Sequence, residues 1–106
     1  MTQPGELDRR LTLEAPVETD DGAGGVTRSY QTVTTLWAAV APVSARADNA
    51  AAGLGAAVTH RIVIRAGRDV TTRHRLRDGA RIFRIVTLRA SADRRFLEID
   101  AEERED

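Results

Sequence analysis

The chain has 106 residues, sixteen Arg and Lys against sixteen Asp and Glu, a formal net charge of zero, and no cysteine. A chain of this length forms one domain with a modest core. The lack of cysteine excludes disulfides, zinc–thiolate sites and thiol nucleophiles. No apolar run approaches the roughly 18 residues that a membrane-spanning helix needs. We therefore expect a single domain over residues 1–106, soluble and cytoplasmic when made.

Charge is polarised along the chain. Residues 60–95 carry eleven Arg against three Asp, a net of +8, whereas residues 98–106 carry six acids and one Arg, a net of −5. Residues 1–59 carry seven acids and four Arg, a net of −3. This distribution favours head-to-tail contact between copies, or one face turned toward an anion, over a uniformly basic nucleic-acid binder.

In the first half of the chain, apolar and polar residues alternate as they do in β-strands. Residues 7–15 place leucines on one face and charged residues on the other, which predicts a half-buried strand. Residues 19–25, TDDGAGG, predict a turn, and residues 26–40 are rich in Thr, Val, Tyr and Trp, which favours a second, long strand. Pro42 then interrupts regular pairing because it has no N–H to donate.

Residues 43–58 differ from their surroundings because they are mostly alanine and glycine. Ser44 could cap a helix and Gly53 could end it, so this segment is either one short helix or a long loop. A helix of about nine residues is too short to be stable alone in water, so packing or a partner would have to hold it.

Further strands follow. Residues 60–65 place Ile62 and Ile64 on one face and Arg61 and Arg65 on the other, and Asp78-Gly79 predicts a hairpin. Residues 80–89 are apolar on both faces, which suggests a strand covered on each side. A last strand begins at residue 96, and the acidic residues 102–106 are expected to fray.

These elements predict an all-β fold, a small antiparallel β-barrel or sandwich of about six strands, with one short helix or long loop between the second and third main strands. The predicted core comprises Leu11, Leu13, Trp37, Ile62, Ile64, Phe83, Ile85, Leu97 and Ile99.

No set of residues indicates catalysis, a metal or a cofactor. His60 and His74 have no third histidine and no cysteine nearby, whereas zinc needs three or four convergent ligands, so His60 is interpreted as a histidine packed at the sheet edge. Asp20 and Asp21 lack the spacing of a calcium loop. No phosphate loop or nucleophile elbow is present. We expect no enzyme activity and no cofactor.

The arginine-rich half allows two interpretations. Alternate arginines on predicted strands could line a phosphate-facing surface, or they could pair with acids of the same sheet or of a neighbouring subunit. Pairing is favoured because the four aromatic residues offer no stacking surface for single strands and no recognition helix is predicted.

The combined pattern resembles the head-tail joining or head-closure (stopper) proteins of long-tailed phages, prophages and phage-derived gene transfer agents. The similar stretches are GELDRRLTLE at 5–14, TLWAAVAPVSA at 35–45, THRIVIRAGRDV at 59–70, DGARIFRIV at 78–86 and DRRFLEIDAEE at 93–103. They follow the family's order over nearly the whole chain.

The resemblance implies a β-barrel that forms a ring of six or twelve copies in the neck of a virion assembled in the bacterial cytoplasm. Its implied partners are a portal-bound adaptor, a tail terminator or tail tube protein, and double-stranded DNA passing through the lumen without sequence specificity. It also implies a channel loop over residues 43–58 that helps retain DNA, in which we single out Ser44, Arg46, Asp48, Asn49 and Leu54.

Contacts between subunits or partners are assigned to four arginines of the basic half, Arg61, Arg65, Arg73 and Arg75. The alternatives are a small DNA-binding β-barrel that uses an arginine-rich face, and a neck protein of the tail-terminator type. An enzyme would need a convergent polar pocket, which the sequence does not predict.

Overall fold

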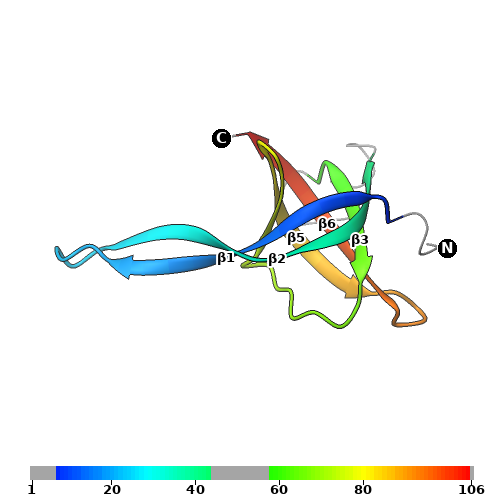
Figure 1. Ribbon diagram of the computed structural model, residues 1–106, viewed down its shortest axis with the longest axis horizontal. Helices are drawn as coiled ribbons and strands as arrows, with labels where there is room; N and C mark the ends of the chain where they lie inside the picture. Colours follow the sequence, from blue (N-terminus) through cyan, green and yellow to red (C-terminus); the bar gives the residue numbers. More distant parts are fainter. Residues whose placement is uncertain (1–6, 44–57, 106) are drawn as a thin grey trace.

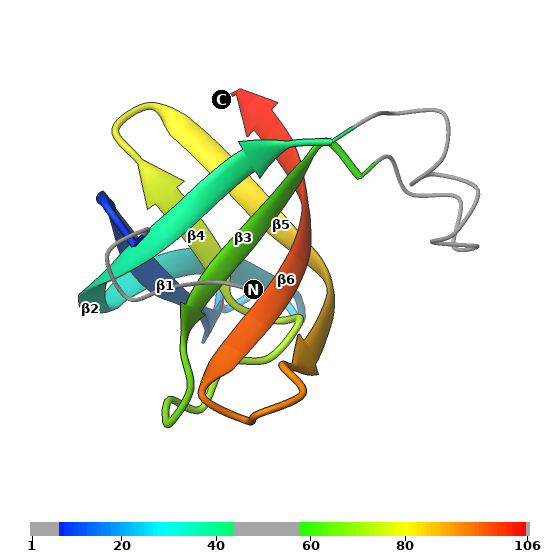
Figure 2. The same ribbon diagram turned by 90° about the vertical axis from the view of Figure 1, so that its right-hand side faces the viewer.

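The computed structural model describes residues 7–43 and 58–105. Their six strands are β1 (Arg9–Asp20), β2 (Val26–Pro42), β3 (His60–Arg65), β4 (Arg75–Asp78), β5 (Arg81–Ala90) and β6 (Phe96–Glu105). They close into a barrel in the order β1-β2-β3-β6-β5-β4, and every neighbouring pair is antiparallel (Figure 2). The predicted small antiparallel barrel is therefore confirmed. No helix among the described residues is long and apolar enough to cross a membrane.

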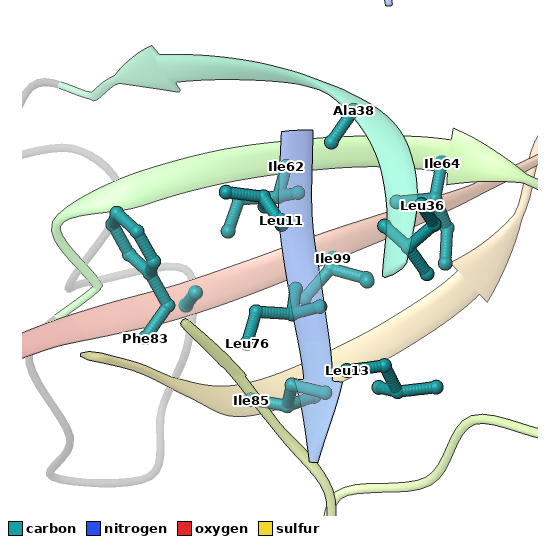
Figure 3. Close-up of a cluster of buried hydrophobic side chains, with 11 residues drawn as sticks. Leu11, Leu13, Leu36, Ala38, Ile62, Ile64, Leu76, Phe83, Ile85 and Ile99 are labelled. Atoms are coloured by element: carbon teal, nitrogen blue, oxygen red, sulfur yellow. The ribbon is translucent and has the colours of Figure 1, made fainter. Parts of the chain in front are cut away.

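The core fills the barrel with the inward side chains of all six strands. Phe83, Ile62 and Ile99 have no solvent-exposed surface, and aliphatic side chains from opposite strands point toward one another around them (Figure 3). The core cluster consists of Leu11, Leu13, Leu36, Ala38, Ile62, Ile64, Leu76, Phe83, Ile85, Ile99 and Ala101. Of the predicted core residues, Leu97 is partly buried and packs against this cluster, and all others except Trp37 are buried in it.

The prediction for Trp37 is wrong, because its side chain lies outside the barrel and is 51% exposed. Its neighbours Leu36 and Ala38 both point inward and are buried. Since successive side chains of a strand point to opposite faces, this phase forces the tryptophan outward, and its large apolar surface does not override the register.

Two bulges shift the phase of long strands. Leu13 pairs with Thr34 and Glu14 with Thr32, so Val33 of β2 has no partner on β1. In β5 the register moves from Ile85 to Thr87, and the unpaired residue is again a valine, Val86.

The β5 bulge explains why residues 80–89 are apolar at both odd and even positions. Ile85 before the bulge is buried, and Leu88 after it packs against the same core. The prediction that this strand is covered on both sides is wrong, because Arg84 and Arg89 on its outer face are exposed.

β1 and β2 continue far beyond the barrel. β1 pairs with β4 only at residues 12–14, and β2 pairs with β3 only at residues 38–42. Residues 15–20 and 26–31 therefore pair only with each other, and they form a two-stranded ribbon that we call the arm. The arm extends to one side of the barrel in Figure 1, and the molecule has extents of 50 × 30 × 24 Å.

The remaining boundaries follow turn chemistry. Gly79 has φ +62° at the first position of the two-residue turn between β4 and β5, which confirms the predicted hairpin. The tail prediction is wrong for residues 102–105, which continue β6 and pair with β5 as far as Arg81↔Glu105. Cross-strand arginines compensate the acids there, so the segment need not fray.

The helix or loop expected between β2 and β3 falls on residues 44–57, which lie outside the described residues. Its two ends are described: the Val43 N–H donates to the Thr59 carbonyl at 3.1 Å, and Val58 is buried. A backbone hydrogen bond therefore joins the described residues on either side of positions 44–57.

Candidate assembly surfaces

A buried carboxylate joins the root of the arm to the barrel wall. The Glu14 side chain on β1 is only 7% exposed, and it accepts a hydrogen bond from Arg75 Nε of β4 at 2.6 Å. Arg77 Nη1 lies 3.5 Å from its other oxygen. Two guanidinium groups thus compensate the cost of burying this charge.

The arm is also held against the barrel by an aromatic contact. The Arg75 guanidinium lies 3.8 Å from the centroid of the Tyr30 ring, a cation–π distance. Farther out, Glu18 is close to Arg28 at 3.2 Å and to Arg73 at 3.6 Å. These contacts connect both strands of the arm to β4 and to the loop that precedes it.

Cross-strand ion pairs cover the outer faces of β3, β5 and β6. Arg81 donates two hydrogen bonds to Glu103, at 2.7 and 3.1 Å, and these raise the pKa of Arg81 and lower the pKa of Glu103. The other pairs in this region are Arg61–Asp100, Arg84–Glu102, Arg104–Glu102, Arg89–Glu98 and Arg89–Asp100.

Asp100 is the most heavily bonded acid of this surface. Burial acts to raise its pKa, but hydrogen bonds from Thr87, Arg89 and Arg61 outweigh burial, so the pKa of Asp100 lies below its usual value. The predicted pairing of arginines with acids of the same sheet is therefore observed for most arginines of the basic half.

His60 begins β3 at one end of the barrel. Its ring packs edge-on against Phe83 with centroids 5.2 Å apart, and Nδ1 lies 3.0 Å from Thr59 Oγ1. Burial lowers the pKa of His60, although Glu103 nearby opposes this shift. The expected packed histidine is found, but a closed barrel has no sheet edge. The described residues contain no cluster of three potential metal ligands.

Positive charge without a carboxylate partner gathers at one part of the barrel. Ten of the fifteen described arginines lie within 4 Å of a described acid, and the five with no such acid among the described residues are Arg10, Arg65, Arg68, Arg94 and Arg95. Four of these five lie at the end of β3 or in two loops: Arg65 ends β3, Arg68 lies in the loop after it, and Arg94 and Arg95 lie in the loop after β5. The Ala66 N–H donates to the Arg95 carbonyl at 3.0 Å, which places the two loops side by side.

A groove runs beside Trp37 at this basic region. Residues 35–37 of β2 form one wall, and residues 64–68, the end of β3 and the loop after it, form the other. Arg65 and Arg68 line the groove, and the Arg10 guanidinium lies 5.2 Å from the centroid of the Trp37 ring. An apolar ring surrounded by cations can bind a surface that is partly apolar and negatively charged.

The four predicted interface arginines lie in different environments. Arg61 and Arg75 are partly buried and bonded to Asp100 and Glu14, whereas Arg73 is exposed near Glu18. Only Arg65 has no acid within 4 Å among the described residues. The predicted channel-loop residues Ser44, Arg46, Asp48, Asn49 and Leu54 lie outside the described residues.

Sequence reasoning missed three features of these surfaces, the roles of Glu14, Tyr30 and Trp37. An acid at an outward position of a strand gives no sign of burial until its cross-strand arginine is known. For Trp37 the sequence does hold a signal, because alternation places it on the opposite face from Leu36 and Ala38.

The chain is similar to a protein family and to solved structures. Residues 2–104 match the model of the phage head completion protein family. The solution structure of protein SF1141 from Shigella flexneri 2a is 29% identical, with a TM-score of 0.76 and 96% of each chain covered. A chain of the virion of a native gene transfer agent particle is 32% identical, with a TM-score of 0.71, 94% of this chain covered and 96% of that one.

No protein with a curated description matches the chain. The family match covers nearly all of the sequence and confirms the resemblance seen in the strand motifs. The chain therefore belongs to the phage head completion protein family.

Proposed function

We propose that this chain is a structural connector that forms a ring in the neck of a phage or phage-like particle, joins the portal-bound adaptor to the tail, and helps retain packaged DNA. Its family indicates a structural protein of the virion. The observation that carries the proposal is the 32% identity, over 94% of this chain, to a chain of a gene transfer agent virion. The particle would be assembled in the bacterial cytoplasm.

The barrel suits a ring subunit. Closure of the sheet leaves no open edge in the barrel wall, and cross-strand ion pairs cover much of its outer face. A rigid body with one long projection can contact a neighbour without rearranging its core.

The DNA-retaining element would be the segment 43–58. Its ends meet through the Val43–Thr59 hydrogen bond, so the barrel can close whatever the segment does. Arg46 and Asp48 would pair between neighbouring copies, and the many small side chains would let several copies meet around a narrow channel. Ser44, Asn49 and Leu54 belong to the same proposal.

The connector role is tested in the particle that encodes the chain. Cryo-EM of purified particles is expected to show a ring of this protein between portal and tail, and deletion of its gene is expected to leave heads without tails. Absence from the particle would contradict the proposal. A position at the tail end would favour the terminator alternative.

The loop is tested separately by deleting residues 46–56. The barrel should fold with unchanged circular dichroism, while particles lose DNA after packaging. Normal DNA retention by particles that contain the shortened protein would contradict the role of this segment.

A further inference from the structure

Two exposed features are unexplained by the barrel itself, the tip of the arm and the groove beside Trp37. A two-stranded ribbon is marginally stable by itself in water, so one that projects this far is expected to rest on a partner. Val26 at the tip is 65% exposed, and Trp37 at the groove is 51% exposed. Each offers apolar surface that the described part of this copy does not cover.

The tip is a formed, negatively charged turn. Asp21 Oδ1 accepts hydrogen bonds from the N–H groups of Ala23 and Gly25, at 2.8 and 3.1 Å, and Asp20 Oδ1 accepts one from Gly22 at 2.9 Å. Neither carboxylate has a cation within 4 Å among the described residues. The turn therefore presents two fixed negative charges next to an exposed valine.

The groove presents the complementary chemistry. Arg10, Arg65 and Arg68 stand around the Trp37 ring, and none of them has a carboxylate within 4 Å in the part of the chain that the structure describes. Only two acids, Asp69 and Asp93, lie in the neighbouring loops that also carry Arg94 and Arg95. Five arginines against two aspartates leave an excess of positive charge.

We propose that the arm tip of one copy, residues 20–26, docks in the groove beside Trp37 of a second copy. Val26 packs on the Trp37 ring, and the carboxylates of Asp20 and Asp21 pair with the arginines around it. The unpaired acids of the tip and the unpaired arginines of the groove thus compensate each other between copies.

The contact is heterologous, because it joins two different surfaces. Figure 1 shows the arm leaving the barrel on the side away from the end of β3, where Arg65 ends the strand. A copy that uses its arm on one neighbour keeps its own groove free for another. Such contacts repeat, and they give a ring if the rotation closes and a filament if it does not.

DNA is the competing occupant of the groove, because arginines also bind phosphates. The second copy is favoured for two reasons. The exposed Trp37 ring has an apolar counterpart in Val26, and the tip carries two carboxylates, Asp20 and Asp21, that can pair with the arginines of the groove. A phosphate surface would use the arginines and leave both apolar side chains exposed.

Cysteine cross-linking tests the contact directly, since the chain has no cysteine of its own. Full-length Ala23→Cys, at the tip, is mixed with Ala66→Cys, which lines the groove, and oxidised at high protein concentration. The matched control mixes Ala23→Cys with Ala80→Cys, an exposed position in the β4–β5 turn. The 23–66 heterodimer should form well above the 23–80 control, and equal yields would overturn the proposal.

Charge neutralisation gives a second measurement. Asp20→Asn with Asp21→Asn keeps an oxygen that accepts the turn hydrogen bonds but removes both charges. This pair, and Arg65→Gln with Arg68→Gln, should each weaken the 23–66 contact about tenfold, as the loss of two or three exposed ion pairs allows. Arg84→Gln with Arg104→Gln changes the net charge equally at arginines that pair with Glu102, and it should have little effect.

The DNA alternative has its own outcome. If the 23–66 yield stays at the control level while Arg65→Gln with Arg68→Gln abolishes binding of a duplex DNA fragment, the groove is a DNA surface and the arm contact is wrong. The arm contact rests on the self-association in the proposed function, but different results would contradict the arm contact and the proposed function. A ring in the particle with 23–66 cross-linking at the control level would contradict only the arm contact.

Discussion

At the scale of single residues, Glu14 is the most consequential charge in the barrel wall. It is the one acid that is buried among the described residues, and Arg75 and Arg77 both bond to it. Removing one partner of a buried ion pair leaves the other charges desolvated without compensation, which costs more than the pair itself contributes.

We therefore expect Glu14→Ala to lower the free energy of unfolding by about 2 kcal/mol, less than for a fully buried pair because Arg77 is half exposed. Urea denaturation measures the change. Glu18→Ala is the control, since Glu18 is exposed and its pairs with Arg28 and Arg73 should contribute at most about 1 kcal/mol. Equal losses in the two variants would contradict the role of Glu14.

His60 should make the barrel sensitive to acid below neutral pH. Burial lowers its pKa in the folded state, so the unfolded chain binds a proton more readily. The contribution of neutral His60 to the free energy of unfolding is therefore complete above the unfolded pKa of about 6.5. It is lost as the pH falls toward the folded pKa. Asp100 and Glu103, whose folded pKa values are also lowered, act in the same direction at lower pH, as it falls through their folded pKa values.

The expected result is a melting temperature that decreases from pH 7 to pH 5, and a smaller decrease in His60→Gln, which cannot titrate. Thermal unfolding followed by circular dichroism at several pH values measures both. A variant that matches the unmodified chain at every pH would show that His60 has no part in the acid sensitivity.

Trp37 shows what could and could not be predicted at this scale. Alternation correctly placed Ile62 and Ile64 inside, because β3 has no bulge and follows one period throughout. The same alternation sets Trp37 on the face opposite the buried Leu36 and Ala38, so its assignment to the core did not follow from the strand pattern. Alternation could not identify Glu14 as buried, since that depends on a strand sixty-one residues away in sequence.

At the scale of elements, the arm is the feature least tied to the rest of the fold. Its strands pair only with each other beyond residue 14 of β1 and before residue 38 of β2. Local opening of such a ribbon breaks few contacts with the core, so its free energy of opening should be far below that of the barrel.

Hydrogen exchange measures this difference. At low protein concentration, amides of residues 15–20 and 26–31 should exchange much faster than those of β3 and β6, and protection of the arm should rise with protein concentration as tips dock. Protection that does not depend on concentration would argue that the arm is stable without a partner.

Shortening the arm should leave the barrel folded. In the shortened variant, Asn-Gly replaces residues 18–28 and joins Val17 to Ser29, which pair with each other. We expect the new junction to form a two-residue hairpin turn. Only exposed contacts are lost, so the free energy of unfolding should change by less than about 1 kcal/mol. A large loss in urea denaturation would show that the arm supports the barrel.

Most strand positions were within reach of the sequence, whereas the order of the strands in the barrel and their lengths were not. Period-two alternation marked residues 7–15 and 26–40, but β1 extends to Asp20 because the arm needs no buried face to keep it paired. The bulges at Val33 and Val86 have no sequence signature of their own. They become visible only when the register of both strands is known.

At the scale of the whole molecule, the relevant property is where charge remains uncompensated. The polarity along the sequence largely cancels in space, since basic β4 and β5 lie beside acidic β1 and β6. What remains is gathered at the tip of the arm and around Trp37. Net charge per segment favoured a contact between the basic residues 60–95 of one copy and the acidic N-terminal half or tail of the next. Most of these charges are instead paired within one copy.

The single tryptophan offers a direct probe of the remaining charge and of assembly. Free copies leave the Trp37 ring half exposed to water, and docking of a tip would cover it with Val26. Its emission should therefore move to shorter wavelength as protein concentration rises. Added salt should reverse the shift only in part, because screening weakens the arginine–aspartate pairs but not the apolar contact.

The arm-shortened variant is the control for this measurement, since it keeps Trp37 and loses the tip. Its emission should stay at the free value at every concentration, and mixing it with an excess of tryptophan-free Trp37→Phe chains, which keep their tips, should restore the shift. This mixture also shows which chain supplies which surface. Only the arm-shortened chain contains a tryptophan, and only the Trp37→Phe chain has an arm tip. A shift in the shortened variant alone would show that Trp37 is covered by some other surface of the barrel.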